Sequence, residues 1–349
     1  MRAVTIGVIA LALCQAGGLG VLLAGDVGVL QAAGAPAVTV AVLRGDGVLV
    51  PIVTRAGNKW TNTWPVPLKA ADVPLALDGI PRRWWGKPGP ATTWHAWQID
   101  GATSEIAVER PTWYLAHCQQ GVGLKTSLTA RPPVPPPTVQ PYPKLGLAST
   151  SPLAFKRIEP VDQGDPMWTK VTDAVAAAIS KAEDEMDGRI VNSLPQLKHP
   201  TPAAERARVA ARVEALYRRP WAAGQSLYYV EATKRYGMPP LPADRRAATP
   251  SSKEGCSVMT FANGFFVAAA DGAIAPAPLN VRVTSCDYDT VSLILPLGAV
   301  GEGKAQVWIG QVTGWDYESY AGFRWDEAAG KIADVFFTHG GWCAEPRGW

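Results

Sequence analysis

The amino-acid sequence predicts a mainly β protein: a small N-terminal antiparallel β barrel or sandwich, followed by an α+β domain in which two helices pack on an antiparallel sheet. Three observations lead to this prediction. Short β-branched runs alternate with turn residues in the first third of the chain, as in small barrels and sandwiches. A proline-rich run interrupts the chain at residues 131–144. Beyond it, helical periodicity comes first and strand-like runs follow, an order typical of α+β domains.

The all-β domain is expected over residues 38–130. Two β-branched runs, 38–43 and 48–53, flank Gly45-Asp46-Gly47, which is typical of a hairpin turn. Four further strand-like runs follow at residues 59–61, 92–98, 105–108 and 113–116. Short strands separated by turn residues in this way indicate a closed or two-layered antiparallel unit.

The proline-rich run is the predicted domain boundary. Seven prolines stand between residues 131 and 144, and proline lacks the backbone N–H that a helix or a central strand needs. We predict an extended, stiff linker over residues 131–150. The alternative is a docking site for a proline-recognising module, and we favour the linker because such partners are mostly intracellular.

The α+β domain is expected over residues 151–349 and begins with helices. Asp165 suits an N-cap, Pro166 suits the first helical position, and apolar residues then recur at helical spacing up to Gly188. A second helix is predicted from Thr201 to Pro220. Four of its apolar residues would share one face: Val209, Val213, Leu216 and Tyr217.

Strand-like runs fill the rest of the chain. They lie at residues 227–232, 257–261, 265–269, 281–285, 291–295, 306–312 and 332–338. Asn263-Gly264 separates two of them and predicts a tight hairpin turn. The second domain is therefore expected to contain an antiparallel sheet.

The first 37 residues have the pattern of a secretory signal. Arg2 supplies a positive charge, residues 3–25 are uncharged, and Ala35-Pro36-Ala37 offers small residues of the kind that signal peptidase recognises. We therefore predict a signal peptide over residues 1–37 and a secreted or periplasmic protein. The alternative is an uncleaved anchor, because an uncharged run of this length can span a bilayer. We favour cleavage because the run is rich in glycine.

Composition limits the classes of partner. The chain has 349 residues, 47% of them hydrophobic, and a net charge of +3. It can bury a substantial core, but its charge is too small to indicate nucleic-acid binding. Contact with a membrane is expected only if the N-terminal segment stays attached. No motif indicates a cofactor or a resident metal, and we expect neither.

The cysteines indicate disulfides. Once Cys14 leaves with the signal, four remain: Cys118, Cys256, Cys286 and Cys343. An even number in an exported chain favours disulfides. We predict Cys256–Cys286, because both stand at the edges of neighbouring predicted strands, and Cys118–Cys343 by elimination. The alternative, a zinc site that adds His117 and His339, has the wrong ligand spacing.

Aromatic residues are the candidates for ligand binding. Of 14 tryptophans, seven lie between residues 60 and 113, and an indole suits the apolar face of a sugar. The candidates are Trp84, Trp85, Trp94, Trp97, Trp315 and Tyr317. Trp94 and Trp97 should face opposite sides of a strand, so that at most one joins the core. The competing interpretation is that these rings only fill the core.

One pair of acids is the candidate for catalysis. On a strand, Asp316 and Glu318 would share one face about 7 Å apart, and paired carboxylates can hydrolyse glycosides. The competing interpretation is a strand whose acids face water. We therefore expect a non-catalytic exported binding or interaction protein with a glycan or an envelope protein as its ligand. The alternative is a secreted hydrolase that acts on glycans.

Overall fold

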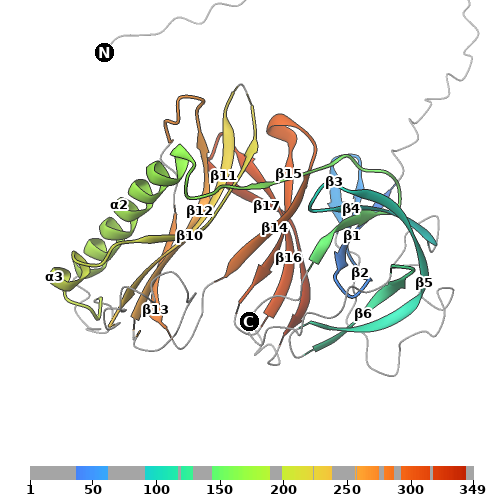
Figure 1. Ribbon diagram of the computed structural model, residues 1–349, viewed down its shortest axis with the longest axis horizontal. Coiled ribbons are helices and arrows are strands. Elements are labelled where there is room, and N and C mark those ends of the chain that lie inside the picture. The colour runs from blue at the N-terminus through green and yellow to red at the C-terminus, as the bar shows by residue number, and fades with distance from the viewer. Residues whose placement is uncertain are drawn as a thin grey trace, which may run out of the picture. The chain divides into compact units, whose positions relative to one another are not determined.

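A computed structural model describes residues 37–61, 91–116, 119–128, 144–188, 199–222, 224–237, 256, 258–274, 279–286, 292–314 and 317–342. The described chain is mainly β, as predicted (Figure 1). The described residues belong to one compact unit. The predicted signal peptide lies outside the described residues except for Ala37. Within the described part, no helix is both long and apolar enough to cross a bilayer.

Six antiparallel strands close into a barrel. Their order around it is β1 (Val38–Arg44), β7 (Lys144–Ser149), β4 (Thr93–Gln98), β5 (Thr103–Ala116), β6 (Gln119–Thr126) and β2 (Val48–Ala56). The barrel closes because β2 pairs back with β1, and β3 (Lys59–Thr61) extends it beyond β2. Inward-facing residues fill its interior, among them Ala41, Leu43, Trp94, Ile106 and Leu124.

Strand β7 corrects the predicted linker. The predicted linker over 131–150 includes residues 144–149, but these pair with β1 on one side and with β4 on the other. The segment has no β-branched residue and gave no strand signal. It is recruited because β1 and β4 would otherwise leave open edges. Gly146 permits the close pairing, since a Cβ there would lie 2.0 Å from the carbonyl oxygen of Trp97. The prolines up to residue 143 lie outside the described residues.

The first predicted helix is confirmed. Helix α2 (Pro166–Gly188) begins and ends where the sequence indicates. The Asp165 Oδ1 atom accepts a hydrogen bond from the backbone N–H of Met167 at 2.8 Å, which satisfies one of the unpaired amides of the first turn.

The second predicted helix is wrong. Residues 201–220 contain one short helix, α3 (Ala203–Arg206), followed by strand β10 (Arg212–Pro220). A β-bulge explains the error: Val213 pairs with Ala232 while Ala215 pairs with Glu231, so one residue is unpaired between them. The extra residue brings Val213 and Leu216 to the same face of the strand. This three-residue spacing resembles helical periodicity.

Two five-stranded antiparallel sheets complete the fold. The first has the order β13 (Asn280–Ser285), β12 (Val258–Ala268), β11 (Ser226–Tyr236), β10 and β9 (Glu159–Pro160). The second has the order β17 (Lys331–Trp342), β16 (Tyr317–Asp326), β15 (Val307–Thr313), β14 (Leu293–Val300) and β8 (Phe155–Lys156). A 3-10 turn, η5 (Gly303–Ala305), connects β14 to β15.

The predicted hairpin turn at Asn263-Gly264 is also wrong. Both residues lie inside β12, where Asn263 pairs with Glu231 of β11 and with Asn280 of β13. The Asn263 side chain donates to the backbone oxygen of Ser292 at 3.0 Å. Two neighbouring strands therefore hold this segment extended, and they override the local turn preference.

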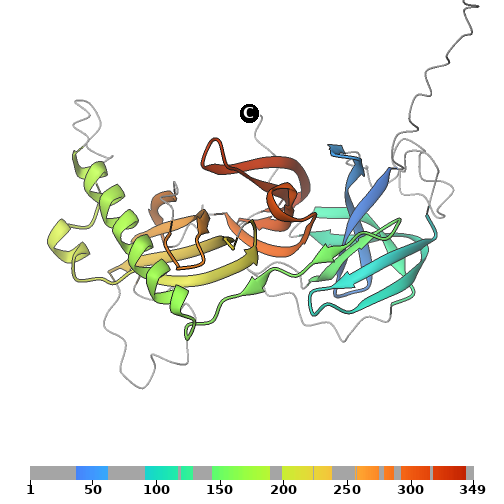
Figure 2. The same ribbon diagram turned by 90° about the horizontal axis from the view of Figure 1, so that it is seen from above.

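Three apolar cores join these parts in layers. Helix α2 packs on one face of the β9–β13 sheet through Val171, Val175 and Ile179 (Figures 1 and 2). The other face of that sheet packs on the second sheet around Trp308 and Phe323. The opposite face of the second sheet packs on the barrel, and we call this the barrel–sheet core. It has members from both halves of the chain.

The structure joins Cys256 and Cys286 in a disulfide, as predicted, with their Cα atoms 5.8 Å apart. Cys256 precedes β12 and Cys286 follows β13, and these two strands are neighbours in the first sheet. Cys118 and Cys343 lie outside the described residues, so their pairing stays a prediction.

Candidate binding site

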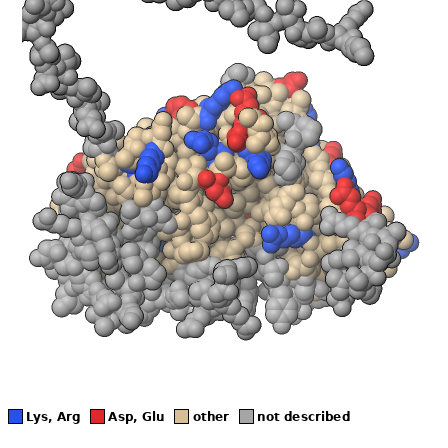
Figure 3. Space-filling model, turned by 180° about the vertical axis from the view of Figure 1, so that it is seen from behind, with Lys and Arg blue, Asp and Glu red and all other residues tan. Residues whose placement is uncertain are grey.

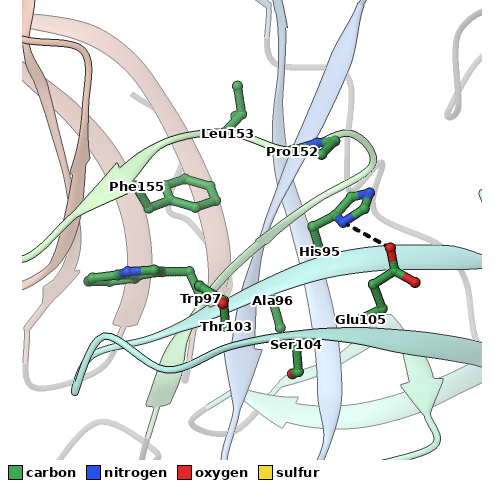
Figure 4. Close-up of a pocket in the computed structure, with 9 residues that line it drawn as sticks. All are labelled: His95, Ala96, Trp97, Thr103, Ser104, Glu105, Pro152, Leu153 and Phe155. Carbon is green, nitrogen blue, oxygen red and sulfur yellow. Dashed lines mark ion pairs between the residues drawn. The ribbon is translucent and has the colours of Figure 1, made fainter.

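A pocket of about 350 Å³ opens on the outer face of the barrel. Its floor is the β4–β5 hairpin and its wall is the segment 152–155, where the chain leaves β7 and enters β8. The wall is held in place because the backbone N–H of Thr39 donates to Thr150 Oγ1 at 3.0 Å. Nine residues line the pocket (Figure 4): His95, Ala96, Trp97, Thr103, Ser104, Glu105, Pro152, Leu153 and Phe155.

The register of the hairpin places its outward side chains. His95 pairs with Glu105 and Trp97 pairs with Thr103. Both pairs lie two positions apart on the same strands and share the outer face, since side chains alternate along a strand. The Asp100-Gly101 turn sets this register, so the sequence carries a local signal for the His95–Glu105 pair.

One end of the pocket is aromatic. The Trp97 and Phe155 rings lie 6.2 Å apart between centroids (Figure 4). Gly298 of β14 leaves room for the indole, because a Cβ there would lie 3.0 Å from Trp97 Cζ3. Leu153 is half-buried beside these rings. Phe155 and Leu153 were not predicted as site residues, since only the tertiary fold brings them to the barrel.

The other end of the pocket is polar. His95 Nδ1 lies 3.6 Å from Glu105 Oε1, and the side chains of the two residues are 32% and 70% exposed. The two rings and this ion pair occupy opposite ends in Figure 4. Glu105 is the one carboxylate among the lining residues, and none of them is Lys or Arg. The arrangement can hold a ligand with an apolar part and a polar part.

Both described tryptophan candidates, Trp94 and Trp97, are buried. They do face opposite sides of β4, but both are buried: Trp94 is 0% exposed in the barrel interior and Trp97 is 7% exposed in the barrel–sheet core. The expectation that at most one joins a core is wrong because both faces of β4 are covered. Neither indole presents an open face on which a sugar could stack.

Glu318 lies in a buried ionic cluster between the barrel and the second sheet. Its Oε1 atom is 3.1 Å from Lys144 Nζ, with both side chains at most 1% exposed. The Tyr320 hydroxyl donates to the same oxygen. We call Glu318, Tyr320, Lys144, Arg44 and Tyr114 the interface cluster. Burial lowers the pKa of Lys144 to about 8, although the nearby Glu318 carboxylate raises it. A catalytic acid must reach substrate, and this placement gives Glu318 no such access.

The other predicted site residues fall into two groups. Tyr317 begins β16, where its hydroxyl and that of Ser292 share a hydrogen bond, and it packs beside the core between the two sheets. The remaining candidates lie outside the described residues: Trp84, Trp85, Trp315 and Asp316. Among described residues, no group of His, Cys, Asp and Glu is suited to hold a metal ion.

A second buried carboxylate, Glu183, was not singled out by the sequence. Thr260 Oγ1 donates to Glu183 Oε1 at 2.6 Å, and the Tyr236 hydroxyl donates to the same atom. Two cations approach Oε2: Lys234 Nζ at 3.2 Å and Arg206 Nε at 3.5 Å. We call these five residues the helix cluster, since Glu183 belongs to α2.

His199 borders the helix cluster. Its Nδ1 atom accepts from the backbone N–H of Thr201 at 3.0 Å. Its Nε2 atom faces Thr260 Oγ1 at 3.2 Å and Glu183 Oε1 at 3.6 Å. All three side chains are buried, so this arrangement anchors the end of α2 rather than meeting a ligand.

Comparisons with known proteins found no match: no protein-family model matches the chain, and neither curated proteins nor solved structures gave a significant similarity. The function is therefore inferred from the geometry of the described residues alone.

Proposed function

We propose that this protein is a non-catalytic binding protein whose barrel carries the ligand site, while the α+β remainder supports it. The observation that carries the proposal is the pocket on β4–β5, which has an aromatic end and, opposite to it, a polar end with the Glu105 carboxylate (Figure 4). Surface pockets that combine apolar walls with a few polar groups are typical of ligand sites.

A protein or peptide suits this pocket better than a glycan. Trp97 is 7% exposed, so a sugar ring has no indole face to cover. An apolar side chain of a peptide could instead insert its end beside Leu153 and the edges of the Trp97 and Phe155 rings, and this contact needs no exposed indole face. On the face seen in Figure 3, acidic and basic residues of the described chain are interleaved and form no large patch of a single sign. Such a surface suits a partner that is neutral or that carries charges of both signs.

The proposal includes export. The Cys256–Cys286 disulfide supports it, because disulfides persist in oxidising compartments. The intact mass of the protein purified from its own host would test how it is exported: a chain that starts at Val38 agrees with a cleaved signal, and a chain that starts at Met1 agrees with the uncleaved anchor instead.

Binding can be tested with a displayed library of short peptides and a panel of oligosaccharides. We expect peptides with apolar side chains to be retained and oligosaccharides not to be. Leu153→Ser should abolish retention because it removes an apolar wall of the pocket. Leu293→Ser is the matched control, since Leu293 is 39% exposed on β14 and does not line the pocket. Equal retention by both variants, or no retained peptide, would overturn the proposal.

A further inference from the structure

The charge of the pocket favours one class of ligand. Glu105 is the one carboxylate among the nine lining residues, and it is 70% exposed at the polar end. None of these nine described residues is a lysine or an arginine. The other ionisable side chain among the nine is His95 on the neighbouring strand, whose Nδ1 atom lies 3.6 Å from Glu105 Oε1. A ligand at this end therefore meets an accessible anion.

The spacing of the two ends defines the ligand further. The Trp97–Thr103 and His95–Glu105 pairs lie two residues apart along β4 and β5, which corresponds to about 7 Å. A ligand whose apolar group contacts Phe155 and Leu153 must extend by a distance of this order to bring a polar atom beside the Glu105 carboxylate. Beside Glu105, this ligand atom would meet one ionisable side chain that can donate a hydrogen bond, that of His95.

We propose that the pocket binds primary amines and guanidines that carry an apolar group a few bonds from the cationic nitrogen. An alkylammonium or arylalkylammonium group has this chemistry, whether free or in a peptide. The nitrogen would donate to Glu105 while the apolar group contacts the aromatic end. This inference rests on the proposed function and adds to it the charge of the ligand.

Three matched probes test the inference: 2-phenylethylamine, 2-phenylethanol and 3-phenylpropanoate. They share a phenyl group and present a cation, a neutral hydroxyl or an anion. Titrations of the full chain followed by NMR should show the amine binding about threefold more tightly than the alcohol, the size expected for an exposed ion pair. The anion should bind most weakly. The advantage of the amine should shrink at high salt.

Variants of one strand provide the controls. Glu105→Gln should remove the preference for the amine and leave the alcohol unchanged. Glu109→Gln makes the same change at an exposed position of β5 that does not line the pocket, and it should preserve the preference. Glu105→Lys should make the anion the preferred probe, a gain that unfolding cannot imitate.

The outcomes separate the two proposals. If all three probes bind equally well, the inferred cation preference is wrong, but the pocket remains a binding site. If the preference survives in Glu105→Gln, the amine binds elsewhere and the inference is overturned. If no probe binds, the inference is also overturned, and the peptide library still decides the proposed function independently.

Discussion

The interface cluster and the helix cluster each bury a glutamate with a tyrosine, a lysine and an arginine, yet they connect different parts of the fold. In the helix cluster, both carboxylate oxygens of Glu183 are engaged: Oε1 accepts from two hydroxyls and Oε2 faces two cations. In the interface cluster, Glu318 Oε1 receives both the Tyr320 hydroxyl and the Lys144 ammonium.

Their positions in the chain differ as well. The helix cluster joins α2 to β11 and β12, which are adjacent layers in the second half of the chain. The interface cluster joins β1, β5 and β7 of the barrel to β16 of the second sheet, and the Tyr114 hydroxyl also donates to the Gly340 oxygen of β17 at 3.3 Å. The same set of buried groups can therefore fix a helix on a sheet in one place and fix the barrel on the second sheet in another.

The largest effect is expected in the helix cluster. Glu183→Gln would leave Lys234 and Arg206 buried without the charge that they share. We expect the free energy of unfolding to fall by about 5 kcal/mol, the upper end for a broken buried pair. Urea denaturation followed by circular dichroism would measure it. The exposed change Glu185→Gln, two positions further along α2, is the control and should cost little. A loss of under 1 kcal/mol for Glu183→Gln would show that water or another anion compensates the two cations.

Breaking the interface cluster should cost less. Lys144→Met leaves Glu318 buried with one cation fewer, but the Tyr320 hydroxyl still donates to it. We expect a loss of about 3 kcal/mol in the free energy of unfolding. Lys156→Met, on the half-exposed side chain of β8, is the matched control. If Lys144→Met cost as much as Glu183→Gln, the proposed difference between the clusters would be wrong.

The pH dependence of stability should identify Lys144. Its folded pKa is lowered to about 8, whereas an unfolded lysine titrates near 10.5. Between pH 8 and 10 the unfolded chain therefore binds more protons, and stability rises with pH. We expect a rise on the order of 2 kcal/mol, since one pKa unit corresponds to about 1.4 kcal/mol. Thermal unfolding at a series of pH values would measure it.

Two features of that titration are diagnostic. Lys144→Met should remove the rise, because no group with a lowered folded pKa then remains in the cluster. Above pH 10 the trend should reverse, because burial raises the pKa values of Tyr114 and Tyr320 and the unfolded tyrosines lose their protons first. A flat profile in the native chain would contradict the burial of a charged Lys144.

The smallest effect is expected for the double variant Lys144→Met/Glu318→Gln. It removes both charges and keeps an acceptor for the Tyr320 hydroxyl, so no buried charge of the pair stays uncompensated. Because buried ion pairs often break even against neutral replacements, we expect stability within about 1 kcal/mol of the native chain. A double-mutant cycle with the two single variants would measure the coupling, and additive losses would contradict a direct Lys144–Glu318 interaction.

Local signals in the sequence predicted much of the fold. The β1–β2 hairpin follows from Gly45-Asp46-Gly47, and α2 follows from its cap and its apolar spacing. The Cys256–Cys286 pairing follows from the edges of neighbouring strands. In each case the residues that decide the structure are close in sequence, or the strands that carry them are adjacent in the sheet.

The candidate site was predicted only in part. Trp97 was a candidate, and the Asp100-Gly101 turn could have indicated the His95–Glu105 pair. Phe155 gave no signal, because it approaches β4 only after β8 joins the second sheet. The same cause explains Glu318: a strand through this residue was considered, but the Lys144 that pairs with it lies in a segment without strand propensity.

By itself, the sequence determined the mainly β character of the chain, the position of α2 and most strands, because backbone propensity and periodicity act over a few residues. Only the tertiary structure decided the rest. The open edges of β1 and β4 recruited β7, a bulge turned the predicted second helix into β10, and packing buried Trp97 and Glu318 on covered faces. These outcomes depend on which surfaces meet, and long-range burial outweighs the local preference of any one segment.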